Sequence, residues 1–233
     1  MLAALSLIIL CGCSRPEVPP PAPVVVAPVK ITPTNQQTLL PFGEGNTWVY
    51  DAEISSSDGD KVVGRDEGEI VFKMSDVKKV GNKTQAFLTA TKGDELLGVS
   101  TWSVSDDGIE QSAGGMKNVP FSSPEPIVKF PIEKNSILTW SNSGEMPDGM
   151  QGAETGVTKV VRAPQIDTAI STVSGIASTA VAKFVSKNNE GVETTTTWFQ
   201  PGVGMVRIVQ TTRIGDRTNA TTIRLKSWEV QHS

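Results

Sequence analysis

Residues 47–54 read T-W-V-Y-D-A-E-I, and this stretch decides the fold class. Its even-numbered positions are all apolar, whereas its odd-numbered positions are mostly polar. A period of two residues is that of a β-strand, because successive side chains point to opposite faces of a sheet. Gly43 and Gly45 lie just before the run and suit a turn that leads into it. The sequence therefore predicts a strand with one buried face here.

The same alternation returns along most of the chain, interrupted by short turns. Further strands are expected at residues 70–75, 86–90, 97–101, 194–199, 205–212 and 221–230. Turns are expected at residues 81–82, 92–94, 106–108, 187–191, 201–204 and 215–217. Such close spacing of strands and turns is typical of antiparallel sheets. We therefore predict a mainly β fold with one antiparallel domain over residues 39–233.

One segment, Ile166–Val185, is ambiguous between an amphipathic helix and two strands. Its threonine, valine and isoleucine content favours strands, because β-branched side chains are stiff in a helix. The pair Ser174–Gly175 in the middle of the segment favours a division at that point. Two strands are the preferred interpretation, and one helix is the alternative.

The composition excludes several kinds of active site. The 233 residues include two cysteines, Cys11 and Cys13, and one histidine, His232. Because these lie near the two ends of the sequence, the domain cannot build a Cys–His pair, a histidine-containing triad or a Cys/His zinc site. Catalysis would have to rest on carboxylates, lysines or a serine, and 25 acidic residues are too many for one pair to stand out. No catalytic residue, metal ligand or cofactor is assigned.

The distribution of charged residues also argues against a nucleic-acid partner. Lysine and arginine number 21 and acidic residues 25, so the formal net charge is −4. No five-residue window is dominated by Lys or Arg, as a phosphate-binding stripe would require. No nucleic-acid partner is therefore expected.

The first thirteen residues carry the most specific motif. Met1–Leu10 is an apolar run without a charged side chain, too short to span a membrane and suited to the apolar part of a secretory signal. Leu10, Cys11, Gly12 and Cys13 then resemble the lipobox of bacterial lipoproteins. The resemblance implies that residues 1–12 are a signal peptide and that Cys13 is acylated as the new N-terminus. A buried apolar strand with two chance cysteines is the alternative.

Two details qualify this motif. The segment before the apolar run has no Lys or Arg, which indicates either a start codon assigned too far downstream or a weak signal. Ser14 stands where enteric lipoproteins retained at the inner membrane carry an aspartate. By resemblance, we expect a lipid-anchored protein of the cell envelope, at the outer membrane if the host has one.

A proline-rich stretch follows the lipobox. Seven of the fifteen prolines lie in residues 15–33. Proline fixes φ and removes backbone donors, so this stretch cannot join a helix or a sheet interior. We expect residues 13–38 to be an extended tether, in which the proline-rich residues 15–33 reach roughly 60 Å at about 3.1 Å per residue. Such a tether holds a folded domain away from the lipid surface.

Two motifs of the domain resemble those of a protein family. Residues 41–50 (P-F-G-E-G-N-T-W-V-Y) and 198–207 (W-F-Q-P-G-V-G-M-V-R) are similar to the opening and closing motifs of uncharacterised secreted bacterial lipoproteins. These in turn resemble the half-barrel lipoproteins typified by the lipoprotein-localisation carriers. The resemblance implies a curved antiparallel half-barrel around an apolar groove, with a sandwich-like arrangement as the alternative. It supplies no catalytic residues.

Trp198 and Phe199 are the candidate groove residues. Neighbours in a strand face opposite sides, so one of these two side chains must be covered by something other than the main core. A second sheet, a loop or a bound ligand could provide the cover. We expect a groove at this place, if there is one.

Two further clusters have simpler interpretations. The acidic residues Asp58, Asp60, Asp66, Glu67 and Glu69 could bind calcium, but the EF-hand spacing is absent and a solvated hairpin tip is favoured. Ser75 and Lys78 match the S-x-x-K pattern of penicillin-recognising enzymes. That pattern needs a helix start and partner motifs, whereas here it lies in an alternating strand, so it is dismissed.

The preferred hypothesis is a non-enzymatic, membrane-anchored envelope lipoprotein that binds an apolar ligand or a protein partner. A structural envelope protein is the close alternative, and a carboxylate-dependent polysaccharide hydrolase is a more distant one. An apolar cavity would favour ligand binding, paired buried carboxylates would favour the enzyme, and a filled core with a flat apolar patch would favour docking.

Overall fold

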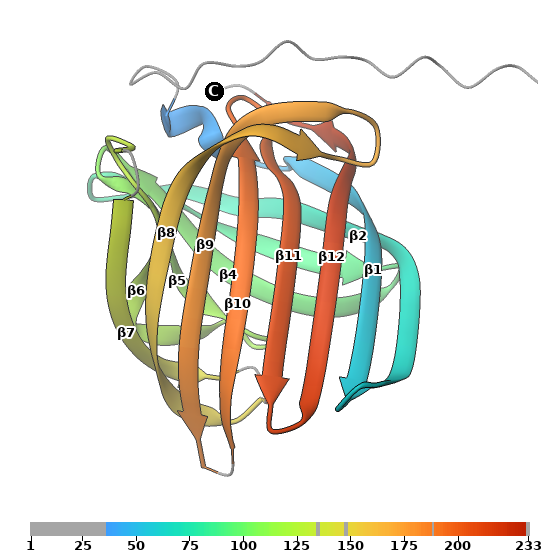
Figure 1. Ribbon diagram of the computed structural model, residues 1–233. Coiled ribbons are helices and arrows are strands. Elements are labelled where there is room, and N and C mark those ends of the chain that lie inside the picture. The colour runs from blue at the N-terminus through green and yellow to red at the C-terminus, as the bar shows by residue number, and fades with distance from the viewer. Residues whose placement is uncertain (1–35, 134–135, 147–148, 188, 232–233) are drawn as a thin grey trace, which may run out of the picture.

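Twelve antiparallel strands form one sheet in the computed structural model, which describes residues 36–133, 136–146, 149–187 and 189–231. A short 3-10 helix, η1 (Gln36–Leu39), precedes the strands (Figure 1). The strands are β1 (Thr47–Asp58), β2 (Lys61–Val80), β3 (Lys83–Lys92), β4 (Glu95–Ser105), β5 (Gly108–Gly114), β6 (Val119–Lys129), β7 (Ser136–Glu145), β8 (Gln151–Asp167), β9 (Thr172–Ser186), β10 (Glu190–Gln200), β11 (Gly204–Ile214) and β12 (Arg217–Glu229).

The sheet is a meander whose first and last strands meet in its middle. Its order is β6-β5-β4-β3-β2-β1-β12-β11-β10-β9-β8-β7, so β1 and β12 are paired, Thr47 opposite Glu229. The two edge strands, β6 and β7, follow each other in the chain. The sheet curves until these edges approach, which gives a nearly closed half-barrel (Figure 1). The predicted mainly β, antiparallel, curved architecture is confirmed.

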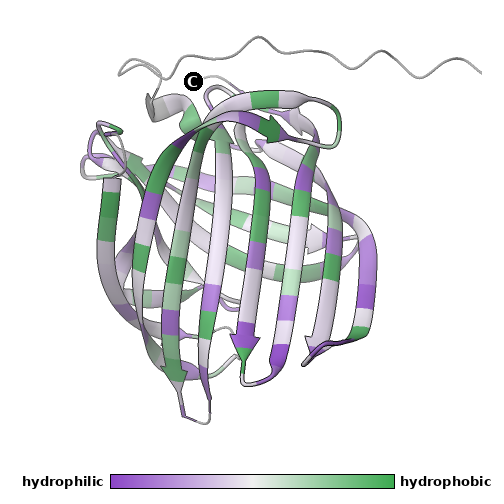
Figure 2. Ribbon diagram, in the orientation of Figure 1, coloured by the Kyte–Doolittle hydropathy of each residue, from purple (hydrophilic) through white to green (hydrophobic). Residues whose placement is uncertain are grey.

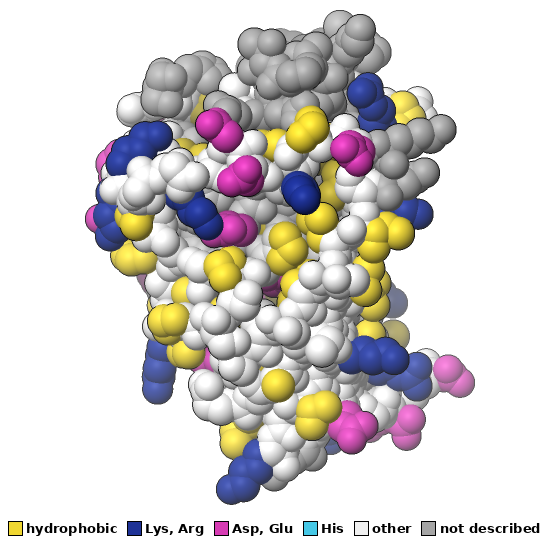
Figure 3. Space-filling model, turned by 90° about the vertical axis from the view of Figure 1, so that its left-hand side faces the viewer, with side chains coloured by type: hydrophobic (Ala, Val, Ile, Leu, Met, Phe, Trp, Pro, Cys, Tyr) yellow, Lys and Arg dark blue, Asp and Glu magenta, His cyan; other side chains and the backbone are white. Residues whose placement is uncertain are grey.

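A hydrogen bond between a backbone group and a side chain connects the two edge strands, β6 and β7. The N–H of Ser143 donates to Ser122 Oγ at 2.8 Å. Three residues of β6, Pro120, Pro124 and Pro126, have no N–H to donate, which suits an edge strand. Seen from this side, hydrophobic and uncharged side chains cover most of the middle of the molecule, and charged ones lie mainly toward its ends (Figure 3).

The seven strands predicted from the alternation all occur, and each is longer than expected. Blocks of contrasting hydropathy follow one another along the strands (Figure 2). The 3-10 helix η1 begins at Gln36, within the last residues assigned to the tether. Residues 1–35, which include the rest of the predicted tether, lie outside the described part of the chain.

Residues 166–185 are strands, as preferred, but their predicted division near Ser174–Gly175 is wrong. β8 ends at Asp167 and β9 begins at Thr172. The Oγ1 of Thr168 accepts the N–H of Ser171 at 3.0 Å and shapes the turn between them. Gly175 lies inside β9, at a position where a Cβ would be only 1.8 Å from the carbonyl oxygen of Phe199. The glycine therefore marks a close approach of two strands and not a turn.

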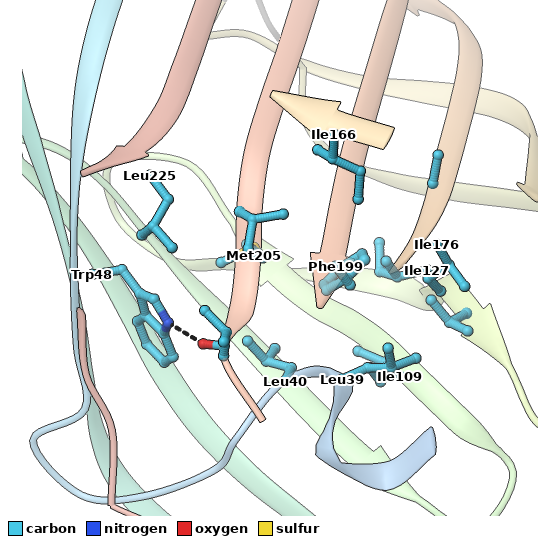
Figure 4. Packing of buried hydrophobic residues seen from close by; sticks show 14 of the residues in the cluster. Leu39, Leu40, Trp48, Ile109, Ile127, Ile166, Ile176, Phe199, Met205 and Leu225 are labelled. Atoms are coloured by element: carbon cyan, nitrogen blue, oxygen red, sulfur yellow. Dashed lines mark hydrogen bonds between the residues drawn. The ribbon is translucent and has the colours of Figure 1, made fainter. Parts of the chain in front are cut away.

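A hydrophobic core fills one end of the half-barrel. Leu39 and Leu40, in and just after η1, pack there with Trp48, Phe199 and Met205, all with at most 1% exposure (Figure 4). The hairpin between β8 and β9 crosses the same end, where the N–H of Ala169 donates to the carbonyl of Leu225 at 3.0 Å. This end is therefore closed, and the remaining interior lies between the strands farther along.

Candidate ligand cavity

The interior beyond the core contains a cavity of about 730 Å³. One wall comes from the inner face of β1–β4 and is mostly apolar, with Ile54, Ile70, Phe72 and Leu88 among its residues. All four have even numbers, and the alternating sequence pattern predicts that the even-numbered residues of these strands face the interior. Leu97, with 36% of its surface exposed, also lines the cavity, so the cavity reaches solvent beside it.

The opposite wall is polar, and the strand register explains its composition. Trp140, Gly156, Ala182, Glu193 and Thr212 are paired in turn across β7, β8, β9, β10 and β11. Paired residues of antiparallel strands share one face, so these five form one inward-facing row. The small residues in the middle of the row leave space, with an aromatic ring at one end and a carboxylate toward the other.

The Trp140 ring is fixed over the backbone of β8. A Cβ at Gly156 would lie 2.2 Å from that ring, so the indole occupies the space that a side chain would take. Its Nε1 donates to Thr158 Oγ1 at 3.0 Å. One hydrogen bond and one glycine therefore orient an aromatic side chain along the cavity wall.

Four glutamates line the cavity: Glu125, Glu145, Glu154 and Glu193. None of them forms an ion pair with a residue of the described chain, and the cavity lining includes no Lys or Arg. Glu193 instead accepts a hydrogen bond from Thr212 Oγ1 at 3.0 Å. The cavity is thus an acidic interior without its own positive counter-charge.

The pKa values of two of these groups reflect that environment. Burial raises the pKa of Glu125 to about 8, and the negative charges of Glu154 and Glu193 add to the rise. Burial also raises the pKa of Glu154; a hydrogen bond from the Asn142 amide opposes the rise, and the charge of Glu193 adds to it. The negative charge of Glu193 therefore lies close enough to disfavour the ionisation of both Glu125 and Glu154.

Raising the pH from about 5 to about 8 should lower the free energy of unfolding by about 2–3 kcal/mol. The pKa of Glu125 is about 8 in the folded protein and about 4.5 as a free group, so the folded state holds more protons between these values. The stabilisation is complete below pH 4.5 and is lost as the pH rises toward 8. This change in the free energy of unfolding is smaller than the full pKa shift would give, because Glu125 retains partial exposure to solvent.

Urea denaturation at several pH values measures this dependence. Glu125→Gln should remove most of it, whereas Glu190→Gln, a change at an exposed position of β10, should leave it intact. Stability that stays constant or rises over this pH range would contradict the assignment.

The residues predicted to carry the lipid lie outside the described part of the chain. These are Cys13 and its signal-cleavage neighbours Leu10, Cys11 and Gly12. Among the described residues, no helix is long and apolar enough to cross a membrane.

Trp198 and Phe199 lie on opposite faces of β10, as their adjacency predicts, and neither lines the cavity. Phe199 is fully buried in the core at the closed end. Trp198 faces outward, with the guanidinium of Arg207 5.0 Å from its ring centre. A cation–π contact from the neighbouring strand therefore provides part of the cover that the sequence required.

The two remaining sequence candidates have ordinary surroundings. Asp66 pairs with Lys92 and Glu69 with Lys226, both on the exposed outer surface. No group of three or more potential metal ligands is close enough to hold an ion within the described residues. The S-x-x-K residues lie at an irregularity of the β2–β3 ladder, where Lys78 pairs with Asp76 at 2.7 Å.

The cavity glutamates were not identified from the sequence, although one signal was present. Glu154 stands in the same alternating phase as Gly156, Thr158 and Val160, which are buried. An acidic residue in the inward phase of a strand marks a polar interior, since strand side chains alternate between faces. The sequence analysis predicts no strand around Glu154, so β8 would first have to be recognised before this signal could be used.

The fold has counterparts among solved structures, whereas no family model and no curated protein sequence matches the chain. The structure is similar to that of a candidate lipoprotein from Parabacteroides distasonis, with a TM-score of 0.53, 13% identity, and coverage of 82% of this chain and 98% of that one. This likeness shows a shared half-barrel fold.

Two further structures were found at lower similarity. A candidate exported protein with a YmcC-like fold from Bacteroides fragilis has a TM-score of 0.40 at 12% identity, covering 81% of this chain and 98% of that one. The hypothetical lipoprotein YmcC from Escherichia coli has a TM-score of 0.32 at 11% identity, covering 85% and 92%. All three proteins are thus described as lipoproteins or exported proteins.

Proposed function

We propose that this chain is a lipid-anchored lipoprotein of the cell envelope whose half-barrel binds a ligand with an apolar part. The cavity of about 730 Å³ carries the binding proposal, because its volume falls within the range of about 300–1,000 Å³ typical of small-molecule sites. Its apolar β1–β4 wall would cover a hydrocarbon portion of the ligand. A purely structural envelope protein would not need such a space inside its sheet.

The anchoring part rests on the lipobox and on the proline-rich tether. Metabolic labelling with an alkyne-tagged fatty acid should label the wild-type chain and a Cys11→Ala variant, but not a Cys13→Ala variant. The reason is that only the residue left at the mature N-terminus carries the acyl chains, which together give stable attachment. Labelling of Cys13→Ala, or its persistence in the membrane fraction, would contradict the assignment.

Filling the cavity should abolish ligand binding. Ala180 lies on its wall, and Ala180→Phe places a ring in the empty space. The fluorescent apolar probe N-phenyl-1-naphthylamine should bind this variant at least about tenfold more weakly than the parent chain. Fluorescence titration with the Cys13→Ala chain, which would lack the acyl chains, measures the effect.

The adjacent residue provides the control. Val181 points outward with 43% of its surface exposed, so Val181→Phe adds the same ring without entering the cavity. Its affinity for the probe should match that of the parent. Equal affinity of both phenylalanine variants would locate the binding elsewhere and overturn the proposal.

The buried carboxylates favour one second candidate, a polysaccharide hydrolase. Glycosidases pair a carboxylic acid of raised pKa with an ionised carboxylate, and the pKa of Glu125 is raised to about 8 beside Glu154. Release of reducing ends from envelope polysaccharides, lost in Glu125→Gln, would establish this activity. The apolar wall facing these groups is the reason for preferring ligand binding.

A further inference from the structure

We infer that the cavity binds an amphiphilic organic cation, with its ammonium group among Glu125, Glu154 and Glu193 and its apolar part along the β1–β4 wall. This inference rests on the proposed function and names the chemical class of the ligand. Four features of the described residues lead to it: carboxylates without a counter-charge, a buried amide oxygen without a donor, an aromatic ring and an apolar wall opposite them.

The first feature is the missing counter-charge. Buried carboxylates are normally paired with cations or fully hydrogen-bonded, because an isolated charge is costly in an apolar interior. On the outer surface of this protein, Asp51 and Glu69 are paired with Lys226. Inside the cavity, Glu125, Glu154 and Glu193 have no such partner among the described residues. A cation supplied from outside would complete the site.

The arrangement of these carboxylates suits an organic cation better than a metal ion. Calcium takes six to eight oxygen ligands at about 2.3–2.6 Å, and no described group of acidic side chains is gathered closely enough for this. All three groups line the cavity, whose volume of about 730 Å³ has room for a substituted ammonium group.

The second feature is Asn142, directly opposite Glu154 in the β7–β8 ladder. The two residues share the inner face, and the amide lies near enough to Glu154 to oppose the rise of its pKa. Asn142 is only 5% exposed; its Nδ2 faces the Glu154 carboxylate, whereas its Oδ1 has no donor among the described residues. Buried polar groups are almost always satisfied, so this oxygen points to a missing donor. An ammonium N–H would donate to Oδ1.

The third feature is Trp140, two residues before Asn142 on the same face of β7. Tryptophan is the side chain best suited to attract a cation over its ring. The hydrogen bond to Thr158 and the close contact with Gly156 hold this ring beside the acidic row. Carboxylates and a fixed aromatic ring together form an environment that favours an ammonium group.

The fourth feature is the opposite wall, which lacks charge. Ile70, Phe72 and Leu88 line it. A ligand that is cationic at one end and apolar at the other therefore matches both walls. A fully apolar ligand would leave the carboxylates without a counter-charge and Asn142 Oδ1 without a donor, and a small inorganic cation would leave the apolar wall uncovered.

Three twelve-carbon probes test the inference: dodecylammonium, dodecanol and dodecyl sulfate, each below its micellar concentration. Isothermal titration calorimetry with the Cys13→Ala chain should show dodecylammonium binding at least about tenfold more tightly than dodecanol, and dodecyl sulfate binding most weakly. In the double variant Glu154→Gln/Glu193→Gln, the affinity for dodecylammonium should fall to that for dodecanol, while dodecanol binding stays unchanged.

The matched control is Glu67→Gln/Glu190→Gln, which removes two exposed carboxylates and should preserve the preference for the cation. Thermal unfolding of each variant checks that the fold is kept. Equal affinities for dodecylammonium and dodecanol, or a preference retained in Glu154→Gln/Glu193→Gln, would overturn the inference and leave the proposed function standing. Failure of all three probes to bind would overturn both.

Discussion

Trp48→Ala should lower the free energy of unfolding by about 3–5 kcal/mol. The ring is fully buried in the core at the closed end of the half-barrel. Its Nε1 donates to the carbonyl of Val203 at 2.6 Å, which ties β1 to the turn before β11 (Figure 4). Gly204, at φ 107°, lies against the indole, since a Cβ there would be 2.9 Å from Nε1. Truncation would therefore open a cavity and leave a buried carbonyl without its donor.

Urea denaturation measures the loss, and Trp228→Ala is the control. Trp228 is paired with Trp48 across β1 and β12 but has 39% of its surface exposed. The same truncation there should cost no more than about 1 kcal/mol. Trp48→Phe should fall between the two, because it keeps much of the apolar volume and loses the hydrogen bond. Similar losses for both alanine variants would show that Trp48 does not anchor this end.

Gly175→Ala should destabilise the fold by about 4 kcal/mol or more. The added Cβ would lie 1.8 Å from the carbonyl oxygen of Phe199 and 2.9 Å from its carbonyl carbon. Both are backbone atoms of the neighbouring β10, so no side-chain rotation relieves the contact. The β9–β10 ladder would have to separate locally, beside the buried Phe199 ring.

Replacement of a second strand glycine by alanine is the control, because it shows the effect of losing a glycine without the steric clash. Gly64 lies in β2 with ordinary space around it, its nearest neighbour being Ser56 Cβ at 3.9 Å. Gly64→Ala should therefore leave the unfolding midpoint nearly unchanged or raise it slightly. Circular dichroism and urea denaturation of both variants test the difference. A Gly175→Ala protein as stable as Gly64→Ala would show that the two strands can move apart at little cost.

Seven strands could be predicted because one face of each is buried and the other is not, whereas no strand was predicted over residues 108–165, which include β5, β6 and β7. The alternation over residues 47–54 is a local property of the chain, and turns such as Asp106–Gly108 end strands through local backbone preferences. The position of Gly175 was misread because its role depends on Phe199, which is distant in the sequence. A glycine required by a neighbouring strand looks the same in sequence as one required by a turn.

The cavity could be anticipated only in outline. An apolar groove followed from the family resemblance, but its acidic wall depends on register. Glu193 and Trp140 reach the same inward row only through the successive pairings of β7 to β10. Trp198 and Phe199 were the expected groove residues because one of the two needs cover outside the main core, and Arg207 supplies part of that cover for Trp198. Such contacts arise from pairing between strands, which composition and spacing do not specify.

The pairing of β1 with β12 has a consequence for how the molecule folds. The strands from β1 to β6 and from β7 to β12 form two meanders, each built from hairpins between neighbours in sequence. Such local pairings close short loops and form early, whereas joining Thr47 to Glu229 closes nearly the whole domain. The two halves can therefore assemble separately, but the cavity, whose walls belong to different halves, exists only after the last strand has been added.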